Sequence, residues 1–153
     1  MKSLVLKILV LNLVFISCSL SSFSINPPHK LIVMKRTPCY GTCPTYSIEI
    51  YTNGKVIYSG TRFVSKIGAY QGVISKKDVD FLIHSIDSIN FFSMDSIYNL
   101  PVTDLPSVIL EVNLNDKTHK VVDRANGPKE LKYIHKLIDS ILNKNIKWTK
   151  LEG

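Results

Sequence analysis

The chain has 153 residues, of which 45% are hydrophobic and 20% are charged, and it contains 7 Gly, 7 Pro and 3 Cys. These values exclude a disordered chain, a collagen-like chain and a disulfide-rich miniprotein, and they predict one compact domain with its own core. The formal net charge is +7, but the basic residues are scattered along the sequence rather than gathered in a block, so we expect no nucleic-acid partner.

Residues 1–17 have the layout of a secretory signal peptide. Lys2 and Lys7 supply positive charge, and an apolar run over residues 8–16 follows, interrupted by Asn12. Nine helical residues span less than half of the roughly 30 Å hydrocarbon core of a bilayer. We therefore expect this segment to be cleaved rather than to remain as a membrane-spanning helix.

Residues 15–18, with the sequence Phe-Ile-Ser-Cys, resemble the lipobox of bacterial lipoproteins. The resemblance implies that Cys18 is lipidated and becomes the new N-terminus, and that residues 18–29 form a lipid-anchored, flexible tether. Because no aspartate follows the cysteine, we expect attachment to the outer membrane, facing the periplasm, with the membrane as a partner. The alternative is an ordinary signal peptide cleaved near residue 21 or 22, which would discard Cys18.

The first part of the predicted domain has the pattern of antiparallel strands. Residues 31–36 are largely apolar, residues 46–51 alternate between apolar and polar, and residues 55–59 follow an Asn53-Gly54 pair. Asn-Gly between two such runs is a strong hairpin signal. Residues 68–74 predict a further short strand, in which glycines mark a bulge or a close approach of another segment.

A helix is predicted after these strands. Ser75 is suited to the capping position, Asp78 follows three residues later, and apolar residues recur at helical spacing as far as position 89. After a proline-containing loop, alternation over residues 108–114, followed by an Asn115-Asp116 turn, predicts a second hairpin.

The last predicted helix opens at Gly127-Pro128, with Pro128 at the first helical position and an apolar stripe over residues 131–142. The element order is therefore β-β-β-β-α-β-β-α. Its tight connections suit antiparallel neighbours. We expect a single α+β domain over residues 30–150, with a mainly antiparallel sheet and two helices packed on it.

Pro38-Cys39-Tyr40-Gly41-Thr42-Cys43-Pro44 joins the first two predicted strands and is the cluster with reactive potential. In an oxidising compartment, Cys39 and Cys43 would form a disulfide, which stabilises by about 2 kcal/mol in the loop-entropy model. Alternatively, both thiolates bind Cu(I) or Zn(II) with a histidine as a further ligand. Catalytic disulfide exchange is a third interpretation, although catalytic cysteines usually lie at a helix N-terminus, which lowers the thiol pKa. Two free thiols are a fourth interpretation.

Other residues carry weaker signals. The four histidines form no His-x-His or His-x3-His pair, and we assign no catalytic residue. Asp104 and Arg124 lie next to predicted turns and are, with Tyr46, candidate functional polar residues; the alternative for Asp104 is capping of its own loop. A hydrolase site assembled from Asp104, Arg124 and a histidine is a further hypothesis.

These motifs resemble those of the DUF6438 family, a family of unknown function. Its pattern combines a Cys-x-Gly-x-Cys-Pro-x-Tyr core, a turn glycine, a Gly-x-Tyr/Phe-x-Gly segment and a Thr-Asp-x-Pro loop. The matching residues here are Cys39, Gly41, Cys43, Pro44, Tyr46, Gly54, Gly68, Gly72, Thr103, Asp104 and Pro106. The resemblance covers about residues 30–148 and implies a single domain in an exported or lipoprotein context, without a mechanism.

We therefore expect an exported lipoprotein of the cell envelope that is a non-catalytic binding or structural module. It would carry a Cys39–Cys43 disulfide, hold no cofactor, and recognise an unidentified envelope protein or ligand. The alternative is a thiol-based Cu- or Zn-binding or redox protein that uses the same two cysteines.

Overall fold

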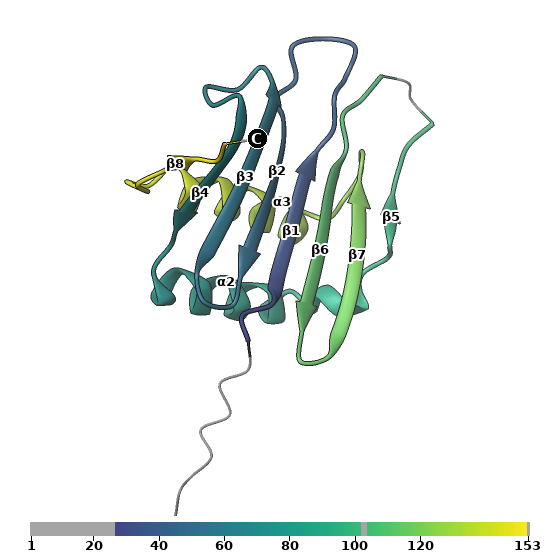
Figure 1. The fold of residues 1–153 in the computed structure, drawn as a ribbon. Helices are drawn as coiled ribbons and strands as arrows, with labels where there is room; N and C mark the ends of the chain where they lie inside the picture. The colour runs from purple at the N-terminus through teal and green to yellow at the C-terminus, as the bar shows by residue number, and fades with distance from the viewer. Residues whose placement is uncertain (1–26, 102–103, 153) are drawn as a thin grey trace, which may run out of the picture.

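The computed structural model describes residues 27–101 and 104–152. Within these ranges, eight strands form one sheet in the order β5-β7-β6-β1-β2-β3-β4-β8. Both α-helices lie on the same face of this sheet, as Figure 1 shows. The β5–β7 pair is parallel and the other pairs are antiparallel. The predicted α+β class, with its mainly antiparallel sheet, is confirmed.

The elements follow the predicted order, with three short additions. The strands are β1 (Lys30–Arg36), β2 (Thr45–Tyr51), β3 (Lys55–Arg62), β4 (Gly68–Val73), β5 (Ile97–Tyr98), β6 (Val108–Leu114), β7 (Lys117–Asp123) and β8 (Thr149–Lys150). The helices are α2 (Lys76–Ser88), the 3₁₀ turn η1 (Phe91–Ser93) and α3 (Lys129–Leu142). The additions are β5, η1 and β8, which are too short to leave a periodic pattern in the sequence.

Both predicted hairpin turns are present. Gly54 has a φ of 83° and follows Thr52 and Asn53 in a three-residue loop. A Cβ atom at Gly54 would lie 2.5 Å from the carbonyl oxygen of Ile74, so glycine is required there by space as well as by conformation. Asn115 and Asp116 have φ values of 51° and 58°, the left-handed pair that a two-residue hairpin loop needs.

The helix starts depend on two different caps. As predicted, the Ser75 hydroxyl oxygen caps α2 by accepting a hydrogen bond from the backbone N–H of Asp78 at 3.1 Å. Pro128, by contrast, is the N-cap of α3 and not its first helical residue, because its ψ of 154° is extended. The proline ring fixes φ but leaves ψ free, so the sequence pattern misplaced the helix start by one residue.

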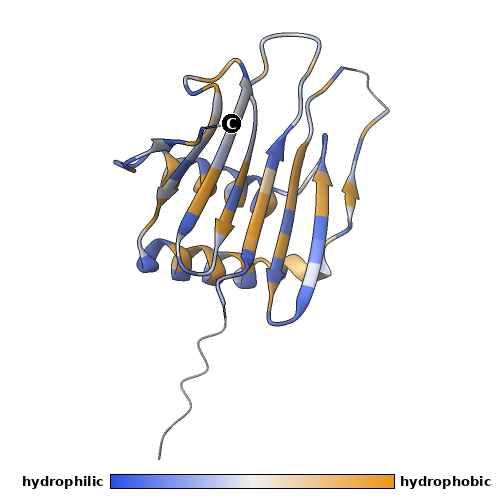
Figure 2. Cartoon of the chain, viewed as in Figure 1, coloured by the Kyte–Doolittle hydropathy of each residue, from blue (hydrophilic) through white to orange (hydrophobic). Residues whose placement is uncertain are grey.

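The core lies between the sheet and the two helices. Hydrophilic and hydrophobic residues alternate along the strands in Figure 2, and the inward positions form aligned cross-strand rows. Met34, for example, lies between Ile48 of β2 and Leu110 of β6, and all three are fully buried. Burial of such aliphatic rows against the helices is the main stabilising contribution to this fold.

The two sheet edges are formed by β5 and β8, which have two residues each. The segment before β8 returns over Gly72, where a Cβ atom would lie 2.5 Å from Ile146 and 3.1 Å from Trp148. The close approach predicted from the glycines of this strand is therefore confirmed at Gly72.

Some expectations concern residues that the structure does not describe. The predicted signal peptide (1–17), the lipidated Cys18 and most of the predicted tether lie outside the described residues. Among the residues that are described, neither helix combines the length and the hydropathy needed to cross a bilayer.

Candidate functional site

Polar side chains replace aliphatic ones in the last inward-facing row of the sheet. This row lies where β1 ends and β2 begins, which we call the loop end. Its neighbours in register are Asp123, Val108, Arg36, Tyr46 and Gly60. Helix α3 passes over this row and brings in two further polar side chains, His135 and Asp139.

Arg36, Tyr46 and Asp139 form a closed hydrogen-bonded triangle. Arg36 Nε donates to Tyr46 Oη at 2.7 Å, and Tyr46 Oη donates to Asp139 Oδ1 at 2.6 Å. Arg36 Nη2 closes the triangle by donating to Asp139 Oδ2 at 2.5 Å. The Arg36 and Asp139 side chains are 25% and 28% exposed, so the ion pair is shielded but can be reached from solvent.

The triangle fixes the protonation of its members. Burial, together with the hydrogen bond to Asp139, raises the pKa of Tyr46 well above its ordinary range, so the phenol keeps its proton. Burial by itself would lower the pKa of Arg36, but the proximity of Tyr46 and Asp139 raises it, and the guanidinium stays charged. The arrangement therefore presents fixed donors and acceptors rather than a group ready to exchange a proton.

His135 lies one helical turn before Asp139 and is 4% exposed. Burial, followed by the positive charges of Arg36 and Lys132, lowers its pKa to about 4, so the ring is neutral near pH 7. Its Nδ1 is 3.9 Å from Asp123 Oδ2. Within the described residues, its Nε2 has no hydrogen-bond partner.

Asp123 is held in place by Gly127. The Asp123 carboxylate accepts a hydrogen bond from the backbone N–H of Gly127 at 3.1 Å. A Cβ atom at position 127 would lie 2.5 Å from the same carboxyl group. The glycine before α3 therefore allows the chain to approach the sheet closely enough for α3 to reach the polar row.

Two pockets flank the triangle and share Pro44, Tyr46 and Asp139 in their walls. The first, which we call the aromatic pocket, has a volume of about 320 Å³, and its walls include Tyr46, Tyr58, Phe63, Ser65, Asp139 and Asn143. The second, the proline pocket, has a volume of about 280 Å³, and its walls include Arg36, Cys43, Pro44, Pro106 and Ser107. The lining of the aromatic pocket is about evenly polar and apolar, whereas that of the proline pocket is mostly apolar. Apolar surface around a few fixed polar groups is typical of small-molecule sites.

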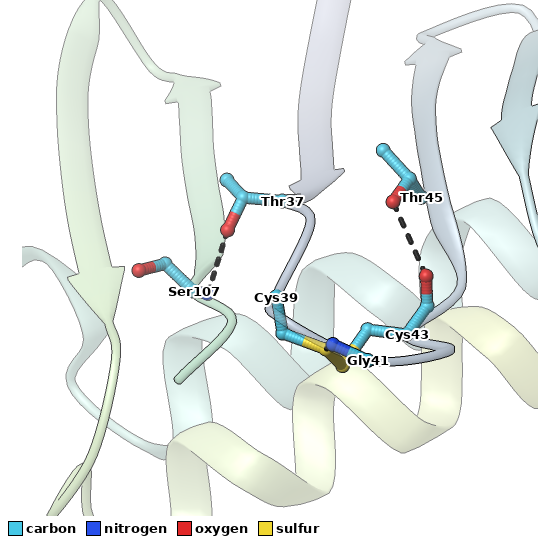
Figure 3. Close-up of a disulfide and its surroundings, with 6 residues drawn as sticks. All are labelled: Thr37, Cys39, Gly41, Cys43, Thr45 and Ser107. Atoms are coloured by element: carbon cyan, nitrogen blue, oxygen red, sulfur yellow. Dashed lines mark hydrogen bonds between the residues drawn. A yellow bond between two sulfur atoms is a disulfide. The ribbon is translucent and has the colours of Figure 1, made fainter. Parts of the chain in front are cut away.

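The predicted Cys39–Cys43 disulfide is present in the loop above the triangle, with the two Cα atoms 5.7 Å apart (Figure 3). Both ends of the loop are held by hydrogen bonds. Thr37 Oγ1 accepts a hydrogen bond from the backbone N–H of Ser107 at 2.7 Å, and Thr45 Oγ1 donates to the Cys43 carbonyl at 3.2 Å. The disulfide and these hydrogen bonds hold Cys43 in the wall of the proline pocket.

The structure separates the residues singled out from the sequence. Cys43 and Tyr46 belong to the site, whereas Asp104 is exposed in its loop with a φ of 64° and lines neither pocket. Arg124 follows β7, and its backbone N–H donates to the Tyr98 carbonyl. Its side chain forms no ion pair with a carboxylate of the described residues.

The sequence analysis missed Arg36, His135 and Asp139. Each of these polar residues occupies a position that periodicity assigns to the buried face of its strand or helix. A charged residue at such a position requires a buried partner. That conflict between pattern and polarity was the signal available.

In residues 27–101 and 104–152, no three His, Cys, Asp or Glu side chains lie close enough together to hold a metal ion. His119 Nε2 forms a hydrogen bond with the Met94 carbonyl at 2.9 Å. Because the sulfurs of Cys39 and Cys43 are bonded to each other, binding of a soft metal would first require their reduction.

Comparisons with known proteins identify a family but no characterised relative. No curated protein matches the chain. The family model described as domain of unknown function (DUF6438) matches residues 30–142. The match extends from the first residue of β1 to the last residue of α3, so it includes the triangle, the disulfide loop and the walls of both pockets apart from Asn143. The chain belongs to the DUF6438 family.

Proposed function

We propose that the protein is an exported lipoprotein whose DUF6438 domain is a non-catalytic binding module of the cell envelope, with its ligand site at the loop end. The observation that carries this proposal is the pair of pockets around the Arg36–Tyr46–Asp139 triangle. The triangle supports binding rather than catalysis because its charges are paired and its phenol is held protonated.

The direction of β1 supports the same proposal. Lys30, the first residue of β1, follows Cys18 by 12 positions, whereas Arg36 ends the strand at the loop end (Figure 1). A chain anchored at Cys18 would therefore enter the domain at the end of the sheet opposite the loop end. A lipid-anchored form would keep its ligand site on the side away from the point of attachment.

The lipid anchor is tested by metabolic labelling with an alkyne-tagged fatty acid in cells that express the wild type or Cys18→Ser. The wild type should incorporate the label and fractionate with membranes, and Cys18→Ser should lose both properties. Equal labelling and equal fractionation of the two proteins would contradict lipidation at Cys18.

The ligand site is tested by photo-crosslinking in cells. A benzophenone amino acid is placed at Phe63, which lines the aromatic pocket, or at Phe81, which lines a separate open pocket formed by α2 and Lys144. The two side chains are equally exposed, at 49% and 50%, so they form a matched pair. Adducts should form at position 63 and not at position 81. Equal adduct formation at both positions would argue against a site at the loop end.

A thiol-based function is the second candidate, favoured by the placement of Cys43 in the wall of the proline pocket. Reduction would free two thiols, and the Cys43 thiol would share a pocket wall with Arg36, whose positive charge favours the thiolate form. Incubation of the reduced protein with Cu(I) or Zn(II), followed by alkylation and intact mass measurement, tests it. Protection of both thiols by one equivalent of metal would support this candidate, and free alkylation in the presence of metal would exclude its metal-binding form.

A further inference from the structure

The aromatic pocket combines stacked rings with an exposed one. The rings of Tyr46 and Tyr58 are stacked, with centroids 5.6 Å apart and an interplanar angle of 30°. Phe63, in the β3–β4 loop, is 49% exposed and contributes a third ring to the pocket wall. Aromatic rings offer flat apolar faces with a partial negative charge, which attract polarised C–H groups.

The polar groups of the same pocket are suited to hydroxyl ligands. A hydroxyl group both donates and accepts hydrogen bonds. Ser65 and the amide of Asn143 can do the same, and the Asp139 carboxylate has acceptor capacity beyond its bonds to Arg36 and Tyr46. A ligand with an apolar face and hydroxyl groups at its edge would satisfy both parts of this wall.

The charges around the pocket favour a neutral ligand. The positive charge of Arg36 compensates Asp139 at 2.5 Å, and the guanidinium of Arg62 lies over the Phe63 ring, 5.2 Å from its centroid. An anionic ligand in the aromatic pocket would lie against the Asp139 carboxylate, and a cationic ligand would find that carboxylate already paired with Arg36. Because burial of an unpaired charge is costly, either kind of ion would be disfavoured relative to a neutral molecule.

We propose that the loop-end site binds a neutral saccharide, with one sugar unit in the aromatic pocket and a linked unit in the proline pocket. Each sugar ring has one face of C–H groups and an edge of hydroxyl groups. The volumes of about 320 and 280 Å³ lie near the lower limit for ligand pockets, which suits one ring in each. The shared Tyr46 and Asp139 place the two units next to each other. This inference rests on the proposed binding function and specifies its ligand class.

Trp148 provides a built-in reporter for the test. It is the only tryptophan in the chain, and its ring lies 5.9 Å from that of Tyr58, which lines the aromatic pocket. The full chain, purified in a detergent without a sugar headgroup, is titrated with glucose, galactose, N-acetylglucosamine and disaccharides of each. Tryptophan fluorescence should change in a saturable way. The preferred disaccharide should bind about tenfold more tightly than its monosaccharide, which corresponds to about 1.4 kcal/mol.

Matched variants locate the response. Phe63→Leu removes a ring from the aromatic pocket and should weaken saccharide binding at least fivefold. Phe81→Leu makes the same change in the separate open pocket formed by α2 and Lys144 and should leave the binding constant as in the wild type. Equal affinities for the two variants would show that any response arises elsewhere and would overturn the assignment to this pocket.

Two further outcomes separate this inference from the proposed function. If no saccharide produces a saturable change up to about 50 mM, far above a millimolar dissociation constant, or if choline or glucuronate binds more tightly than every neutral sugar, the saccharide inference is wrong. Crosslinking at position 63 that yields protease-sensitive adducts would then keep the binding module and replace the ligand by a peptide or protein. Failure of crosslinking at position 63 as well would remove the proposed function too.

Discussion

The two helices cover the same face of the sheet but differ in what their buried sides contain. The polar residue that α2 buries, Ser85, is satisfied within the helix, since its hydroxyl donates to the Phe81 carbonyl at 2.8 Å. On α3, Asp139 accepts a hydrogen bond from Tyr46 of β2, and His135 lies next to Asp123 of β7. Helix α2 therefore contributes to packing, whereas α3 contributes to packing and completes the site.

The difference follows from where each helix crosses the sheet. Helix α2 lies near the β2–β3 turn, where Val79 is 3.8 Å from the position of a Cβ atom at Gly54. Helix α3 crosses the loop end, where the inward row contains Asp123, Arg36 and Tyr46. In this domain, the helix with polar residues on its buried side is therefore the one that lines both pockets, through Asp139.

The largest expected effect is one that the two helices should share. Ile86 of α2 and Ile138 of α3 are both fully buried, so truncation of either to alanine should destabilise by about 3 kcal/mol, within the range of 2–5. Urea unfolding followed by far-UV circular dichroism measures both. If Ile86→Ala lowered the free energy of unfolding and Ile138→Ala left it nearly unchanged, α3 would contribute to the site without contributing to packing.

The second effect belongs to α3. The pKa of His135 is about 4 in the folded protein, below its ordinary value of about 6.5, so the unfolded chain binds more protons between these values. Above pH 6.5, protonation of His135 should therefore cost no stability. The free energy of unfolding should fall as the pH drops from 6.5 toward 4. The loss should reach roughly 3 kcal/mol, less any attraction between protonated His135 and Asp123 at 3.9 Å.

Urea unfolding at a series of pH values measures this dependence, and His135→Gln is the informative variant. Between pH 4 and 6.5, the free energy of unfolding of the glutamine variant should depend less steeply on pH than that of the wild type. Identical slopes for the two proteins would mean that His135 is not the group responsible.

The third effect concerns the loop above α3. The free energy of unfolding of the Cys39→Ser/Cys43→Ser variant should be about 2 kcal/mol lower than that of the wild type. The reason is that the disulfide closes a small ring, which reduces the entropy of the unfolded chain. The core should stay intact, since Tyr40 is 93% exposed and neither cysteine belongs to the core. Thermal unfolding and near-UV circular dichroism check both points. Loss of the native near-UV signal would assign the disulfide to the fold rather than to the site.

The smallest effect contrasts one carboxylate on each helix. Asp139→Asn removes the charge that pairs with Arg36, which should cost about 1–2 kcal/mol at this partly exposed pair. Asp87→Asn changes an exposed residue of α2 and should stay within about 0.5 kcal/mol of the wild type. Equal changes in the free energy of unfolding, measured with urea, would show that the Asp139 charge adds nothing to stability.

Local patterns predicted the parts of the fold that depend on neighbours in sequence. The alternation in β2 and β6, the Asn-Gly and Asn-Asp turns and the Ser75 cap each depend on a few adjacent residues, and each is present. The two-residue strands β5 and β8 were not predicted, because a strand of two residues has no period to detect.

The site was predicted only where it overlaps a motif. Tyr46 and Cys43 lie close to each other in sequence and were singled out as parts of the cysteine motif. The Arg36–Asp139 pair joins residues 103 positions apart, and no local pattern relates them. Identification of this pair required the register of β1 with β2 and the position at which α3 crosses it, which are properties of the folded chain.

The short edge strands of the sheet affect how copies of this protein meet each other. A long exposed edge would present unpaired backbone groups to a neighbouring molecule and could start an intermolecular sheet. Here the long strands β7 and β4 are each partly covered by a two-residue strand, and β8 ends in Lys150, whose charge disfavours a further strand. The domain is thereby protected against edge-to-edge aggregation where many copies are crowded together.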